Sequence, residues 1–255
     1  MNVKNFYNLI YKVLGWWRLK TKNNFGFLGT GKPTIGLGEY IVGWEILQPS
    51  GQWDNYLPDY EYQRFAWGDT MACVTYSMLN CLETLLKRIY NEKWDFSDRF
   101  TAKESGTTSN GNTQYNVIES FRRINGFLSF LFWRNETLSW SDYYASIPPN
   151  LINLAKQNLK EFNIQYEWIE PTSPEKLKDA LKNSPLWISI YAYGEKVNGV
   201  YQRIEGNYPN HCVELYGYDE NGNWKIFDHY LGCEKRLLAS DYLIGSAVKI
   251  KIIKS

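Results

Sequence analysis

"YPNHCVELYGYDENGNWKIFDHYLG", residues 208–232, contains both histidines of the 255-residue chain. His211 begins a run of alternating apolar and polar residues, and a second such run includes Asp228. The residues between the runs, Glu220-Asn221-Gly222-Asn223, are typical of a tight hairpin turn. A hairpin brings the start of its first strand beside the end of its second strand. We therefore expect the imidazole of His211 and the carboxylate of Asp228 to lie close together.

A cysteine stands near the start of the most regular helical pattern in the chain. From Ala72 to Ile89 apolar residues recur every three or four positions, which predicts a helix that Asp69 or Thr70 caps. Cys73 is then in the first turn, where the helix dipole and unpaired backbone N–H groups lower the pKa of a thiol. The resulting thiolate can attack a carbonyl carbon, but the reaction also needs a proton partner such as histidine.

The predicted elements change from helices to strands along the chain. Further helices are expected at 113–124, about 150–162 and 174–182. A period of two then predicts strands at 186–194, 211–219, 223–230 and 246–253. Helices followed by antiparallel sheet predict an α+β protein in which a helical lobe packs against a sheet lobe. We expect Cys73 as nucleophile, His211 as base and Asp228 as orienting carboxylate to meet in the cleft between the lobes.

Composition narrows the class of protein. Lysine and arginine number 28 and aspartate and glutamate 27, with no basic block, so nucleic acid is not an expected partner. With 44% hydrophobic residues the chain can form a globular core, and no stretch approaches a membrane span. Four cysteines without a CxxC pair predict reduced thiols. We therefore expect a cytoplasmic or virion-associated protein, with no signal peptide evident.

The remaining cysteines and the second histidine have simpler expected roles. Cys81 and Cys212 are expected to be buried structural residues, with Cys212 on the sheet face opposite His211. His229 is expected to be exposed or at the rim of the cleft. A zinc site would need His229 and Cys233 together with Cys212 or His211, but no paired ligand element anchors it. No metal or other cofactor is therefore expected.

Three segments match, in order, the sequence pattern of one enzyme family. They are "DTMACVTYS" (69–77), "NHCVELYGYD" (210–219) and "NWKIFDHYLG" (223–232). They resemble the nucleophile, histidine and orienting segments of papain-like cysteine peptidases, and the general texture is similar to phage-encoded or bacterial members. The 138 residues from Cys73 to His211 (211 − 73 = 138) fit the family's spacing of roughly 130–150. The resemblance implies a papain-like two-lobe fold and thiol-dependent amide hydrolysis through an acyl-enzyme at Cys73.

Three positions depart from the family pattern. The family has a glutamine six residues before the cysteine as an oxyanion donor, whereas this chain has Trp67 there and its nearest upstream glutamine is Gln63. The resemblance assigns the oxyanion role to Gln63 if residues 64–69 form a bulged loop. The orienting residue is Asp228 in place of asparagine, as in the related bacteriocin-leader-processing peptidases. Tyr230 replaces the tryptophan that shields the histidine.

The chain is longer than such a domain requires. We predict a papain-like domain at 46–255, with a helical lobe at about 60–170 and a sheet lobe at about 171–255. Residues 1–45 are then an N-terminal arm: a pro-segment, a partner-docking arm or a virion-type anchoring arm. A peptide or protein substrate is expected. Two other functions stay open, namely a binding or structural protein with a degraded catalytic site, and an acyl transferase that uses the same nucleophile.

Overall fold

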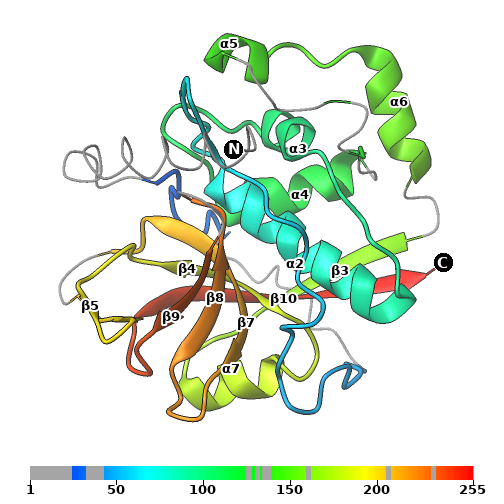
Figure 1. Ribbon diagram of the computed structural model, residues 1–255. Helices are drawn as coiled ribbons and strands as arrows, with labels where there is room; N and C mark the ends of the chain where they lie inside the picture. The colour runs from blue at the N-terminus through cyan, green and yellow to red at the C-terminus, as the bar shows by residue number, and fades with distance from the viewer. Residues whose placement is uncertain are drawn as a thin grey trace, which may run out of the picture.

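A long helix lies between a group of shorter helices and a large sheet (Figure 1). The computed structural model describes residues 25–32, 43–124, 128–129, 133, 139–158, 162–204, 208–230 and 234–254. The long helix is α2 (Cys73–Tyr90). The helices on its other side are α3 (Asp98–Glu104), α4 (Gln114–Ile124), α5 (Trp140–Tyr143) and α6 (Pro149–Asn158). The expected α+β class, with a helical lobe and a sheet lobe, is confirmed.

The sheet has eight strands in the order β3-β10-β4-β7-β8-β9-β6-β5. All neighbours pair antiparallel except β6 and β9, which pair in parallel. The strands are β3 (Phe162–Trp168), β4 (Leu186–Ile190), β5 (Lys196–Val197), β6 (Val200–Tyr201), β7 (His211–Tyr218), β8 (Trp224–Asp228), β9 (Glu234–Leu238) and β10 (Ile244–Lys254). Helix α7 (Pro174–Ala180) precedes β4, and a separate two-stranded hairpin consists of β1 (Arg64–Phe65) and β2 (Gly68–Asp69).

The regular patterns located the helices α2, α4, α6 and α7 and the strands β4, β7, β8 and β10, but they missed the remaining short helices and strands, among them β3 and β9. The helices expected at 113–124 and 174–182 correspond to α4 and α7, and the expected hairpin is β7–β8. β3 was missed although its apolar residues alternate, because the helix before it was expected to extend to residue 162. β9 has the sequence EKRLL, whose residues favour helix, and it becomes a strand by pairing with β8 and β6. Of the helices in the described residues, none is long and apolar enough to traverse a bilayer.

Helix α2 is buried over most of its length. Residues 73–86 are all buried, with β7 on one side and α3 and α4 on the other. Its start differs from the prediction, because Ala72 is the N-cap and makes no side-chain capping bond. Asp69 and Thr70 instead accept bonds from the N–H groups of residues 71 and 72, which precede the helix. Cys81 lies in the core, as expected.

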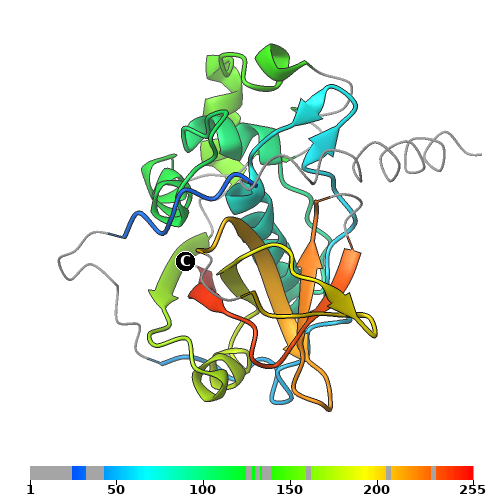
Figure 2. The same cartoon turned by 90° about the vertical axis from the view of Figure 1, so that its left-hand side faces the viewer.

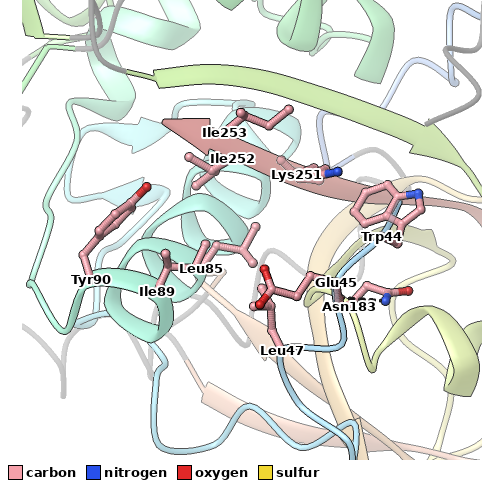
Figure 3. Close-up of a pocket in the computed structure, with 11 residues that line it drawn as sticks. Trp44, Glu45, Leu47, Leu85, Ile89, Tyr90, Asn183, Lys251, Ile252 and Ile253 are labelled. Carbon is pink, nitrogen blue, oxygen red and sulfur yellow. Dashed lines mark hydrogen bonds between the residues drawn. The ribbon is translucent and has the colours of Figure 1, made fainter. Parts of the chain in front are cut away.

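A non-helical segment, residues 43–63, fastens the far end of α2 to the sheet lobe. Trp53 is fully buried, its indole N–H donates to the carbonyl of Leu181 (2.8 Å) and its backbone N–H donates to Tyr216 (2.9 Å). Near the start of the segment, Trp44 and Leu47 line a cavity of about 320 Å³ between α2 and β10 (Figure 3). This cavity contains none of the residues predicted to be catalytic.

We expect Trp53→Ala to lower the free energy of unfolding by about 3–5 kcal/mol, because it removes a buried aromatic side chain and leaves a cavity. Trp53→Phe keeps most of the packing and loses the indole bond, so its expected cost is about 1 kcal/mol beyond the volume change. Denaturant unfolding measures both. The half-exposed Val197, replaced by alanine, is the control. Equal stability of Trp53→Ala and wild type would show that the segment is not anchored here.

Candidate active site

Cys73 is the first residue of α2, the position that the sequence predicted for the nucleophile. Its thiol is fully buried. The N-terminal end of a helix carries unpaired N–H groups and a partial positive charge, which favour a thiolate. The carbonyl of Cys73 accepts a bond from Ser77 Oγ (2.6 Å), and Ser77 in turn accepts one from the indole of Trp187 on β4 (2.8 Å). The start of the helix is therefore held against the sheet.

His211 and Asp228 meet as the hairpin predicted. His211 begins β7, Asp228 ends β8, and the two strands pair antiparallel. Nε2 of His211 lies 2.9 Å from Oδ1 of Asp228, and both side chains are fully buried. The other ring nitrogen of His211, Nδ1, makes no hydrogen bond that meets the usual distance and angle limits. It is therefore available to the thiol of Cys73, with which the imidazole interacts. The structure therefore brings all three predicted residues together.

The three groups shift one another's pKa values in the directions that a thiolate–imidazolium pair requires. Burial opposes ionisation of Cys73, but hydrogen bonds from Cys212 and His211 and the charge of His211 lower its pKa to about 6. Burial likewise opposes protonation of His211, yet the charge and hydrogen bond of Asp228 raise its pKa to about 10. Burial also disfavours the charged form of Asp228, but the positive charges of His211 and Arg236 hold the pKa of this carboxyl below its usual range.

Asp228 has further partners that the sequence analysis did not identify. Its Oδ1 also accepts the backbone N–H of Tyr230 (2.9 Å). Its Oδ2 accepts the hydroxyl of Tyr193 (2.5 Å) and lies 3.2 Å from Nε of Arg236. Tyr230 also packs its ring 5.9 Å from that of His211, in the position expected for the shielding side chain.

Gln63 reaches the site because the residues after it loop out. The β1–β2 hairpin comprises residues 64–69, and the carbonyl of Gln63 accepts the N–H of Thr70 (3.1 Å). This is the bulge on which its predicted oxyanion role depended. Nε2 of Gln63, however, donates to the carbonyl of Phe25 (3.2 Å) and to Oδ1 of Asp69 (2.8 Å). Both amide hydrogens are thus engaged by the chain itself, and the oxyanion role remains a prediction.

Residues 25–32, here called the covering segment, lie against His211 and Gln63. Figure 2 shows this segment in dark blue beside one end of α2. The ring of Phe25 is 5.4 Å from that of His211, and its N–H donates to the carbonyl of Asn210 (3.2 Å). Asn112 in the helical lobe donates to the carbonyl of Gly26 and accepts from the N–H of Leu28, both at 2.8 Å. The segment is therefore bonded to both lobes.

His229 differs from its expected position, and Cys212 makes a contact that was not expected. His229 was expected to be exposed or at the rim, but it is fully buried, with its ring 5.1 Å from that of Tyr76 and its Nδ1 3.1 Å from the amide of Asn80. Burial lowers the pKa of His229 to about 3, so it is neutral at physiological pH. Cys212 is buried as expected, but its thiol contacts that of Cys73, and burial raises its pKa.

Only some of the residues of the possible zinc site lie within the described part of the chain. Cys233, which it requires, lies outside the described residues. Among the residues that are described, histidine, cysteine, aspartate and glutamate form no group of three or more suited to holding a metal ion.

The backbone is similar to those of solved cysteine proteases. No family model matches the sequence, and neither does any curated protein. Bromelain from Ananas comosus, in complex with the E64 inhibitor, has a TM-score of 0.59 at 14% identity, over 78% of this chain and 97% of its own. Amb a 11, a ragweed pollen allergen in its proform, has a TM-score of 0.62 at 16% identity, over 96% of this chain and 75% of its own.

A third similar structure is a bacterial surface protein. The protease and lectin-like domains of Cwp84 from Clostridium difficile have a TM-score of 0.63 at 14% identity, over 95% of this chain. This chain spans only 59% of that one, and 56% of Cwp84 after propeptide cleavage. The backbone thus resembles those of proteins that share little sequence with it, and the chain has the papain-like fold of cysteine proteases.

Proposed function

We propose that the chain is a cysteine peptidase that hydrolyses amide bonds of a peptide or protein through an acyl-enzyme at Cys73. The observation that carries the proposal is the buried constellation in which Cys73 begins a helix beside His211, and His211 is bonded to Asp228 at 2.9 Å. The pKa of about 6 for Cys73 and of about 10 for His211 favour the ion pair at neutral pH.

The chemistry follows from these positions. The Cys73 thiolate attacks the carbonyl carbon, and the electron pair of the C=O bond moves to oxygen. The backbone N–H of Cys73 stabilises this oxyanion, and so does Gln63 once its amide leaves Phe25. The carbonyl then re-forms while His211 protonates the departing amine. Water attacks the thioester with His211 as base, which releases the acid and regenerates the thiolate.

We also propose that the arm at residues 1–45 is a pro-segment that blocks the site. Phe25 contacts His211 and occupies the amide of Gln63, so a substrate would need the covering segment to leave.

A binding protein with a degraded site is the second candidate. It is favoured by the complete burial of Cys73 and by the occupied amide hydrogens of Gln63. For either function we propose a compartment that keeps thiols reduced, in the cytoplasm or a virion, because Cys73, Cys81 and Cys212 are free.

Replacement of the nucleophile separates the two candidates. We expect Cys73→Ala to lower kcat for peptide hydrolysis by about 10⁴-fold or more, since the acyl-enzyme can no longer form. Cys81→Ala, eight residues along the same buried helix, is the matched control and should keep its activity. Mass spectrometry should find a thiol-directed electrophile on Cys73 alone. A Cys73→Ala protein that hydrolyses peptides at the wild-type rate contradicts the assignment.

The pH dependence of hydrolysis follows from the ion pair. We expect kcat/KM to rise as the pH increases through about 6, where the thiol of Cys73 ionises, and to fall as it increases through about 10, where His211 loses its proton. Asp228→Asn removes the carboxylate that raises the pKa of His211. Its alkaline limb should therefore move to lower pH, together with a reduced kcat. An alkaline limb at the same pH in both proteins would reject the role of Asp228.

Removal of the covering side chain should open the site. Burial of a phenylalanine contributes about 1.5–3 kcal/mol, so Phe25→Ala should increase the rate of Cys73 alkylation by about 10- to 100-fold. Leu28→Ala, in the same segment, changes a side chain that is 51% exposed and should leave the rate unchanged. Timed alkylation followed by mass spectrometry gives both rates. Identical rates for Phe25→Ala and wild type would show that the segment does not limit access.

A further inference from the structure

The carboxylate of Asp228 has several partners besides His211. Two groups approach each oxygen of Asp228. His211 Nε2 and the N–H of Tyr230 bond to Oδ1, the hydroxyl of Tyr193 donates to Oδ2, and Nε of Arg236 forms an ion pair with Oδ2 at 3.2 Å. A carboxylate has about four acceptor positions, and three hydrogen bonds and one ion pair surround this one. It cannot rotate without breaking bonds to at least two elements of the sheet lobe.

Arg236 is itself fixed by the surrounding strands. Its Nη1 donates to the hydroxyl of Tyr201 on β6 (3.0 Å), and its Nη2 donates to the carbonyl of Tyr230 (3.1 Å). The guanidinium also lies over the ring of Tyr193, 4.6 Å from its centroid. The side chain is only 8% exposed. A buried guanidinium in this setting keeps its charge and presents it in one geometry.

The strand register explains how the two charges meet. Asp228 pairs with position 234 across the β8–β9 ladder, and Arg236 lies two residues further along β9. Residues two apart on a strand share a sheet face, and diagonal neighbours lie within reach of long side chains. Tyr193 reaches the same carboxylate from the chain that follows β4. Three separate parts of the sheet lobe thus converge on one carboxylate.

We infer that Arg236 and Tyr193 are positioning residues, which fix the outer oxygen of Asp228 and offset its charge so that the inner oxygen holds His211 in one orientation. This inference rests on the proposed peptidase function. A lone aspartate buried here would bear an uncompensated charge and could turn either oxygen toward the imidazole. With Arg236 paired, the carboxylate acts on His211 as a fixed and partly neutralised acceptor. Neither residue touches the reacting atoms.

A buried ion pair could instead serve stability alone, and the kinetic constants distinguish the two roles. We expect Tyr193→Phe and Arg236→Gln to lower kcat by about 10- to 100-fold with KM nearly unchanged, because a misoriented imidazole slows proton transfer and not substrate binding. Lys235→Gln removes the neighbouring exposed cation of β9 and is the control. Wild-type kcat in both Tyr193→Phe and Arg236→Gln, once each is shown to fold, overturns the inference.

Removal of both charges tests whether Asp228 and Arg236 act as a unit. Asp228→Asn leaves the guanidinium buried without its partner, and Arg236→Gln does the same to the carboxylate. The double variant has neither charge, and its amide oxygen can still accept from His211. We expect its kcat to exceed that of each single variant, and strictly additive losses would contradict the inference. This variant also remains measurable if Arg236→Gln alone does not fold.

Titration of His211 by NMR makes the test independent of catalysis. The chain has only two histidines, so comparison with His229→Gln assigns the signals. Loss of the guanidinium should raise the pKa of His211 in Arg236→Gln, and loss of both charges should lower it below the wild-type value. If the wild type does not hydrolyse peptides but these shifts occur, the proposed function fails and the positioning role stands. Unchanged titration in both variants refutes the positioning role.

Discussion

The hydrogen bond between His211 and Asp228 is the constraint on which the site depends. It joins the first residue of β7 to the last residue of β8, and both partners are completely buried. A buried carboxylate is costly unless its charge and its lone pairs are satisfied. The surroundings of Asp228 meet this requirement with an imidazole, a guanidinium, a hydroxyl and a backbone N–H. The polar groups at this end of the sheet lobe are therefore arranged around the carboxylate of Asp228.

The same bond influences the pKa of the Cys73 thiol. Asp228 favours the protonated form of His211, and protonated His211 favours the thiolate of Cys73. The effect passes from the sheet lobe to the helical lobe, because the thiol begins α2 while its proton partner begins β7. Neither lobe contains a reactive group alone. Packing of α2 against β7 is thus both the core of the fold and the condition for a low thiol pKa.

The sequence predicted that Cys73, His211 and Asp228 come together because its signals are local. A hairpin of known turn chemistry fixes which ends meet, and a helical period fixes which cysteine is in a first turn. Arg236 and Tyr193 gave no such signal, since their relation to Asp228 arises only when β9 pairs with β8 and the chain after β4 folds back. Phe25 was also beyond prediction, because its contact with His211 joins residues 186 positions apart (211 − 25 = 186) in a segment without periodicity.

The complete burial of Cys73 and His211 has two opposed effects. Excluding water strengthens the attraction between His211 and both of its charged partners, which supports the low pKa of Cys73. It also denies a substrate any access to the thiol, which has no exposed surface. Departure of Phe25 would weaken the attraction between His211 and its charged partners, but it would let a substrate reach the thiol. On the proposed function, the constellation would tolerate this exchange because Asp228 is also held by Arg236 and Tyr193. If both proposals hold, the sheet lobe sets the orientation of the imidazole, and the covering segment controls whether the thiol can be reached.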